Sequence, residues 1–127
     1  VQDCGLSMNP KIDIGQIEGA FIQGLGWLTC EELFWNNHGK LMTTGPSTYK
    51  IPGSRDIPNS LNVKLLDNSP NGEKTIFRSK AVGEPPLMLA ISAWLAIRNA
   101  VSNFRKENIL NLNAPATPEE ILKAINS

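Results

Sequence analysis

The order and spacing of the apolar residues predict an α+β fold, in which a glycine-rich helix and a long C-terminal helix pack on a sheet of antiparallel strands. Three observations indicate this class. A helical apolar pattern opens the chain, alternating apolar residues fill its middle, and a second helical pattern follows residue 86. Because helices and strands are grouped instead of alternating, a parallel sheet is not expected. With 127 residues, the chain has room for one domain.

The first helix is predicted over residues 13–28, with Asp13 as its N-cap. Its apolar residues recur at three- and four-residue steps, at Ile14, Ile17, Phe21, Leu25 and Leu28. Four glycines lie in or just past this helix, at Gly15, Gly19, Gly24 and Gly26. Each glycine in a helix interior costs about 1 kcal/mol relative to alanine. We therefore expect something to approach the backbone of this helix closely.

The middle of the chain predicts strands and turns. Residues 29–35 and 40–44 are expected to form a hairpin around the turn 36–39, and residues 45–53 an ordered loop. Further strands are predicted where Leu61, Val63 and Leu65 alternate with their neighbours, and at residues 75–78 after a turn at 68–73.

The last third of the chain predicts two helices. Pro85 and Pro86 lead into an amphipathic helix that extends to about Lys106. Thr117, Pro118 and Glu120 have the spacing of a capping box, with a proline at the first helical position. A short helix is therefore expected to follow Thr117.

Composition and charge exclude several classes of protein. Apolar residues make up 41% of the chain and charged residues 19%, which is typical of a globular domain. The 12 Lys and Arg residues balance the 12 Asp and Glu residues, so the field that attracts phosphate backbones or anionic lipids is missing. The longest apolar stretch, residues 87–97, is too short to cross a bilayer. Neither nucleic acid nor a membrane is therefore an expected partner.

The cysteines and the N-terminus bear on the cellular context. Cys4 and Cys30 match no zinc or redox spacing, which predicts free thiols in a reducing compartment, with Cys30 buried and Cys4 in a loop. The chain starts at Val1 without a leader segment. This start is expected for a piece of a longer chain, and equally for a chain that has lost an initiator Met or a tag.

Few residues suggest chemistry by their pattern alone. His38, the single histidine, lies in a predicted turn without a partner at ligand spacing, so we expect an exposed turn residue. The neighbours Glu31 and Glu32 point to opposite faces of a strand and cannot easily share a site.

Glu84 has two interpretations, because it lies between Gly83 and two prolines at the start of the second long helix. Its carboxylate can accept the unpaired N–H groups of the first turn, which would make it a cap. Alternatively, Gly83 lets a ligand come close, the prolines hold the carboxylate rigid, and Glu84 acts as a general base. The helix N-terminus favours the anion while burial disfavours it, so the residues leave both interpretations open.

Three segments resemble, in order and spacing, the C-terminal part of the xanthine dehydrogenases. They are residues 15–26 (GQIEGAFIQGLG), residues 45–52 (GPSTYKIP) and residues 80–87 (KAVGEPPL). The resemblance extends from about Asp3 to Glu119. It implies that residues 1–127 are the C-terminal portion of a molybdopterin-binding domain, as a fragment of a longer chain.

The resemblance also implies a parent enzyme. That parent is expected to be a cytoplasmic, or alternatively peroxisomal, homodimer of purine catabolism that oxidises hypoxanthine and xanthine to urate. Molybdopterin would bind this domain, FAD and [2Fe–2S] clusters would lie elsewhere in the parent, and NAD or oxygen would accept the electrons. In this family, the glutamate of the Gly-Glu-Pro-Pro motif takes a proton from a molybdenum-bound hydroxide, and Glu84 matches it. Gln16 matches a glutamine beside the molybdopterin, and Gly83 is expected at the cofactor. No metal ligand is expected from this chain, which should be inactive alone.

Two other functions stay open. An enzyme similar to aldehyde oxidase would use the same cofactor on aldehydes and heteroaromatic compounds. Its glutamate is typically followed by Ser-Gly, so Pro85 and Pro86, together with Ser47 and Thr48, favour xanthine dehydrogenase. The third possibility is a non-catalytic packing or interaction module, in which Glu84 only caps a helix.

Overall fold

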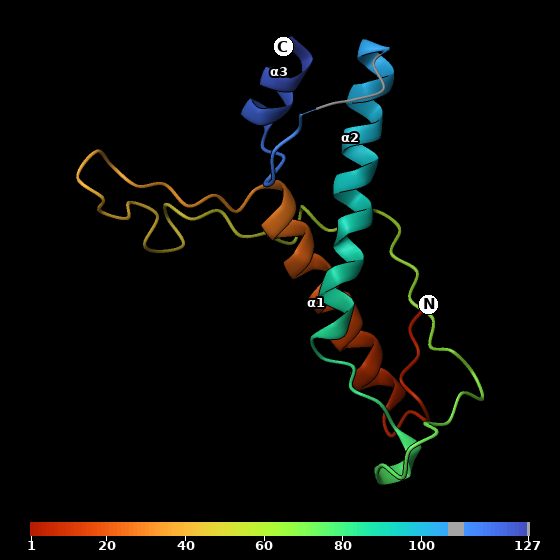
Figure 1. Ribbon diagram of the computed structural model, residues 1–127. Coiled ribbons are helices and arrows are strands. Elements are labelled where there is room, and N and C mark those ends of the chain that lie inside the picture. Colours follow the sequence, from red (N-terminus) through yellow and green to blue (C-terminus); the bar gives the residue numbers. More distant parts are fainter. Residues whose placement is uncertain (107–110, 127) are drawn as a thin grey trace.

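The computed structural model describes residues 1–106 and 111–126, and its regular elements are all helical. In chain order they are α1 (Pro10–Thr29), the 3₁₀ segments η1 (Ile76–Arg78) and η2 (Pro85–Ala90), α2 (Ile91–Arg105) and α3 (Pro118–Asn126). The segment η2 and the start of α2 lie along α1, while α3 lies beside the far end of α2 (Figure 1). The connection 31–60, called the arm below, extends away from the helices on one side (Figure 1).

Helix α1 confirms the predicted helix and corrects its start. The predicted N-cap, Asp13, is wrong, because Asn9 accepts the Ile12 N–H at 3.3 Å and Pro10 opens the helix. A proline suits the first turn, whose N–H groups have no intrahelical partner. The Asp13 carboxylate instead accepts a hydrogen bond from the Ser7 hydroxyl. The helix therefore begins three residues before the predicted start.

The predicted antiparallel sheet is wrong for the described residues, where pairing is limited to three isolated bridges. The expected hairpin is reduced to the bridge between Trp35 and Leu41, with the Met42 N–H bonded to the Phe34 carbonyl at 2.8 Å. The strand predicted at residues 75–78 is the 3₁₀ segment η1, in which Phe77 has a φ of 51°. The α+β class is therefore corrected to helices joined by extended segments.

Residues 61–65 explain why the sheet was predicted. Leu61, Val63 and Leu65 are half-buried, whereas the residues between them are exposed, as the alternation predicted. However, Leu61 and Val63 face Ile17 and Phe21 of α1 across a small cavity. An extended segment that packs on a helix buries every second side chain just as a sheet strand does. The alternation therefore predicted the half-buried side chains correctly. Their packing partner, however, is helix α1 and not a neighbouring strand.

The second long helix is confirmed, but it begins with a tighter turn. Pro85 and Pro86 open the 3₁₀ segment η2, which continues directly into α2. The combined stretch Pro85–Arg105 is long and apolar enough, by length and composition alone, to cross a membrane, so the shorter stretch expected from sequence was an underestimate. Only 11% of its most apolar 18-residue window is buried in the described structure, although the stretch packs against both α1 and α3.

A small apolar core joins α2 to α3. It contains Val101, Leu112, Ala116 and Ala124, with four partly buried side chains around it, Trp94, Ile97, Ile121 and Ile125. The predicted cap of α3 is confirmed, since Thr117 Oγ1 accepts the Glu120 N–H at 3.3 Å. The Glu120 carboxylate does not complete the box, because it binds Lys123 and Asn113.

The cysteines are free and Cys4 lies outside the helices, as predicted, but the predicted burial of Cys30 is wrong. Cys4 is buried and Cys30 is only half-buried. Cys30 follows the last residue of α1, where its N–H bonds to the Gly26 carbonyl at 3.0 Å. Burial raises the pKa of the Cys4 thiol, and the nearby Asp13 carboxylate adds to that rise.

Candidate functional site

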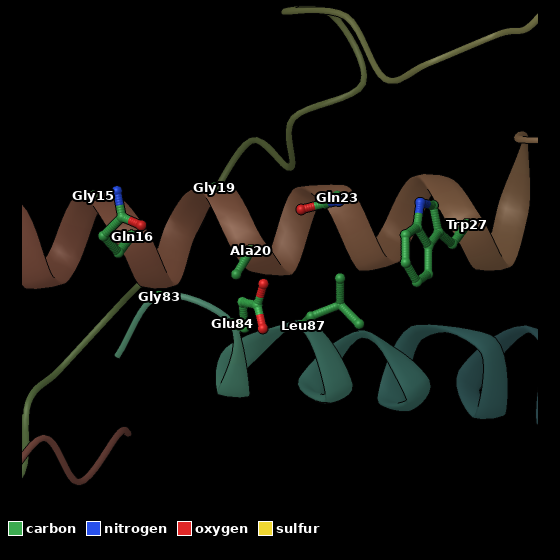
Figure 2. Close-up of a pocket in the computed structure, with 9 residues that line it drawn as sticks. All are labelled: Gly15, Gln16, Gly19, Ala20, Gln23, Trp27, Gly83, Glu84 and Leu87. Atoms are coloured by element: carbon green, nitrogen blue, oxygen red, sulfur yellow. The ribbon is translucent and has the colours of Figure 1, made fainter. Parts of the chain in front are cut away.

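A cavity of about 480 Å³ lies between α1 and the turn that enters η2. One wall is a stripe of α1 and the other is the start of η2 (Figure 2). The lining residues are Gly15, Gln16, Gly19, Ala20, Gln23 and Trp27 from α1, and Gly83, Glu84 and Leu87 from the other wall. A cavity of this size is in the range of small-molecule and cofactor sites.

The α1 wall follows from helical geometry. Gln16, Ala20, Gln23 and Trp27 are spaced by four, three and four residues, which places them on one face of the helix. Two amides and one indole N–H therefore line a single stripe, with a short side chain between them (Figure 2).

Two glycines leave the backbone of this wall bare. A Cβ built on Gly15 or on Gly19 would meet no other atom within 4 Å. Both residues line the cavity, so their missing side chains leave open space at the helix backbone. At these two positions no described residue approaches α1, so a close approach there stays a prediction.

The opposite wall presents the Glu84 carboxylate. Glu84 stands at the N-cap position of η2, but its side chain makes no capping hydrogen bond. Figure 2 shows the carboxylate between the two walls, directed toward Ala20 of α1. Within residues 1–106 and 111–126, its oxygens have no hydrogen-bond or ion-pair partner. The geometry of the side chain therefore does not support a capping role.

The three residues singled out from the sequence meet at one end of the cavity. Gln16, Gly83 and Glu84 all line it, although α1 and η2 are far apart in the chain. A Cβ on Gly83 would lie 3.3 Å from Gln16 Oε1, so the glycine backbone and the glutamine amide are neighbours. Larger side chains at residue 83 would press on Gln16.

The two walls are held together by a different glycine. A Cβ on Gly24 would collide with the Leu87 carbonyl oxygen and lie 2.8 Å from the Ala90 Cβ. Gly24 therefore lets η2 approach the backbone of α1 directly. Gly26 allows a similar approach of the arm, since its Cβ would lie 2.6 Å from the Pro52 ring.

The charges of the site are sparse. Glu84 is the single ionisable residue that lines the cavity. In the described part of the chain, no group of three or more His, Cys, Asp and Glu side chains could hold a metal ion. The cavity therefore offers amides, an indole, bare backbone and one carboxylate, which suits a polar organic ligand and a proton transfer.

Other candidates from the sequence lie away from the cavity. His38 is exposed in a turn, as predicted. Glu31 accepts a hydrogen bond from the Tyr49 hydroxyl at 2.6 Å, and this bond raises the pKa of Tyr49. The Glu31 carboxylate therefore binds Tyr49 and forms no site with Glu32. The lining residues Gln23 and Trp27 were missed, although their seven- and eleven-residue spacing from Gln16 was a readable signal.

Comparisons with known proteins indicate the family of this chain. Residues 1–58 match the family described as a molybdopterin cofactor-binding domain. Xanthine dehydrogenase/oxidase of Felis catus is 53% identical over 98% of this chain and 10% of its own length. Xanthine dehydrogenase 2 of Arabidopsis thaliana is 53% identical over 96% of this chain and 10% of its own length.

Solved structures with a similar fold are also known. The quinoline 2-oxidoreductase of Pseudomonas putida 86 has a TM-score of 0.82 and 30% identity, over 98% of this chain and 15% of that one. A CO dehydrogenase of Oligotropha carboxidovorans has a TM-score of 0.80 over 96% of this chain and 15% of that one, and its 20% identity shows the fold alone.

The match of residues 1–58 thus assigns this part of the chain to the class of molybdopterin cofactor-binding domains. The chain belongs to the xanthine dehydrogenase family of molybdenum hydroxylases, as a segment of the molybdopterin-binding domain. It spans about a tenth of the length of the curated relatives that it matches.

Proposed function

We propose that this chain forms one wall of the cofactor and substrate pocket of a xanthine dehydrogenase-like enzyme, with Glu84 as its general base. The observation that carries the proposal is the Glu84 carboxylate, which faces the cavity without a capping or ion-pair partner. A base must be free to accept a proton, whereas a carboxylate held by backbone N–H groups is a poorer acceptor.

The residues of the α1 wall fit a molybdopterin. The bare backbone at Gly15 and Gly19 leaves room for a flat, polar ring system to lie against the helix. The Gln16 amide can both donate and accept hydrogen bonds at the edge of such a ligand. Because Gly83 has no side chain, the opposite wall leaves space beside the Gln16 amide. When bound, the molybdenum cofactor supplies the acceptor for the two electrons that leave the substrate.

Glu84 would act on the oxygen nucleophile. In the net reaction, a purine C–H and a water yield a C–OH, two electrons and two protons. Glu84 takes one proton from the attacking oxygen, which makes that oxygen a stronger nucleophile toward an electron-poor ring carbon. The following prolines restrict the backbone, and Pro86 is fully buried, so the chain directly after the carboxylate is held in place.

The proposal for the rest of the parent is based on the resemblance to the xanthine dehydrogenases. We propose hypoxanthine and xanthine as substrates and urate as product, because the relatives over nearly the whole chain are named xanthine dehydrogenases. FAD and [2Fe–2S] clusters would carry electrons to NAD or oxygen elsewhere in a cytoplasmic, homodimeric parent. An aldehyde oxidase-like enzyme with heteroaromatic substrates is the second candidate, favoured by the structural similarity to a quinoline 2-oxidoreductase.

Replacing Glu84 by glutamine in the parent enzyme tests the proposal. Glu84→Gln keeps the shape and removes the base, and general-base catalysis typically contributes about 10²- to 10⁴-fold. We expect reduction of the molybdenum centre by xanthine, followed by stopped-flow absorbance, to slow by that factor at unchanged molybdenum content. Glu73→Gln, an exposed carboxylate outside the cavity, is the matched control. Near-normal reduction in a fully loaded Glu84→Gln enzyme would contradict the role of Glu84.

A further inference from the structure

We infer that Asp3 is a positioning residue for Glu84, acting through an ion pair that fixes the start of the turn carrying the carboxylate. The inference rests on the proposed role of Glu84 as the base. It concerns the N-terminal residues 3–6, called the clamp below, and their contacts with residues 78–80.

The clamp is bound to residues 78–80 along the backbone. The Lys80 N–H donates to the Cys4 carbonyl at 2.8 Å, and the Leu6 N–H donates to the Arg78 carbonyl at 3.1 Å. Between them, Gly5 and Ser79 form an antiparallel bridge. The clamp therefore sets the position of the chain four residues before Glu84.

Gly5 brings the two backbones unusually close. It has a φ of 66°, and a Cβ there would collide with the Arg78 carbonyl oxygen and lie 3.0 Å from the Lys80 nitrogen. No other residue type fits this position without displacing residues 78–80. The contact is thus direct and leaves little freedom in the register of the two segments.

A charge pair closes the same contact. The Lys80 ammonium forms an ion pair with the Asp3 carboxylate, and both side chains are about one third exposed. The other oxygen of Asp3 accepts the Gly5 N–H at 3.0 Å. The Lys80 ammonium, helped by that N–H, lowers the pKa of Asp3, so the carboxylate is ionised at neutral pH.

The chain continues from the clamp through residues 7–9 into α1, which carries the other wall of the cavity. Ser7 donates to Asp13 in the first turn of α1, and Asn9 caps the helix. At the other end of the turn, Leu87 lies against Gly24 of α1. The stretch with Glu84 is therefore fixed to α1 at both ends, by the clamp before it and by Leu87 after it.

The turn between these ends is not backed by solid packing. Another cavity, of about 240 Å³, lies between the clamp and the residues Gln16 and Gly83. With space on that side, the position of the turn depends on how firmly its ends are held. Loosening the Asp3–Lys80 pair should therefore move Glu84 relative to Gln16, and displacements near 1 Å are enough to slow catalysis up to 10²-fold.

The experiment uses the full-length parent enzyme and the variant Asp3→Asn, which keeps an acceptor for the Gly5 N–H and removes the charge. We expect kcat for xanthine to fall about 10-fold, with KM and molybdenum content nearly unchanged. Lys80→Met removes the ammonium and leaves the Asp3 bond to the Gly5 N–H, so it should lower kcat to the same extent, and the double variant Asp3→Asn with Lys80→Met should lower it no further. Asp56→Asn is the matched control, because Asp56 binds Lys50 and the Gly53 N–H in the same way within the arm.

A double-mutant cycle separates this inference from the proposed role of Glu84. If Asp3 acts through Glu84, Asp3→Asn should slow reduction of the molybdenum centre in the native enzyme and cause no further slowing in the Glu84→Gln enzyme. An equal effect in both backgrounds, or a normal kcat in Lys80→Met, would overturn the inference and leave the base intact. Normal reduction in Glu84→Gln alone would overturn the proposed function first.

Discussion

The two halves of α1 use glycine for opposite purposes. In the N-terminal half, Gly15 and Gly19 face open space in the cavity, and no described residue packs where their side chains are missing. In the C-terminal half, Gly24 and Gly26 lie against η2 and the arm, where a Cβ would collide. The first pair weakens the helix without any packing gain in this chain, whereas the second pair is required by its packing. We propose that the ligand lies against the first pair, because these two glycines combine a helix interior with the cavity wall.

The largest expected effect is on the isolated 127-residue chain. If the N-terminal half of α1 is one wall of a pocket, that wall alone should bind no molybdenum and oxidise neither xanthine nor aldehydes. Exposed apolar side chains such as Ile76, Phe77 and Phe104, each more than 70% exposed, should make the chain self-associate. Elemental analysis and light scattering over a concentration series measure both. A monomeric chain with stoichiometric molybdenum would show that the open half is a complete site.

Removal of the Gln16 side chain tests the open half in the parent. Gln16→Ala should weaken retention of the cofactor, because the loss of a hydrogen bond to a strongly polar group corresponds to roughly 1.5–3 kcal/mol. Molybdenum occupancy should fall during dialysis, while activity per bound molybdenum stays near normal. Lys11→Ala, in the first turn of α1 and outside the cavity, should leave occupancy unchanged. Full occupancy with normal activity in Gln16→Ala would remove this contact from the site.

A methyl group in the packed half should destabilise the fold. Gly24→Ala places its Cβ against the Leu87 carbonyl and Ala90, and overpacking of this kind typically costs about 1–3 kcal/mol. We expect a lower urea midpoint for the helical circular dichroism signal of the 127-residue chain. The same variant in the parent should express in reduced soluble yield. Unchanged stability would mean that η2 does not press on Gly24.

The smallest effect is expected for the same substitution in the open half. The new methyl group of Gly19→Ala meets no other described residue within 4 Å, so it should stabilise the isolated chain by up to about 1 kcal/mol through helix propensity. In the parent, the same methyl group should lower molybdenum occupancy, because it enters the space left for the cofactor. A higher stability of the isolated chain together with a lower molybdenum occupancy of the parent would support the different roles of Gly19 and Gly24. A gain in stability without loss of occupancy would place the ligand elsewhere.

The sequence by itself determined the local elements. The three- and four-residue spacing predicted the body of α1, and the Thr117-Pro118 signal predicted the start of α3, because both depend on contacts within a few residues. The alternation at residues 61–65 predicted which side chains are half-buried. The resemblance of the Gly-Gln-Ile-Glu-Gly and Gly-Glu-Pro-Pro segments indicated the family that the comparisons then showed.

Tertiary structure alone decided which segments meet. The alternation could not tell a strand partner from the side of α1, so the predicted sheet was wrong. The four helix glycines looked equivalent until η2 and the arm were placed against two of them. The ion pair between Asp3 and Lys80 joins the two ends of a long sequence interval. The physical reason is the same in each case: the period of a sequence reports which face of an element is buried, whereas the group that covers this face comes from distant residues.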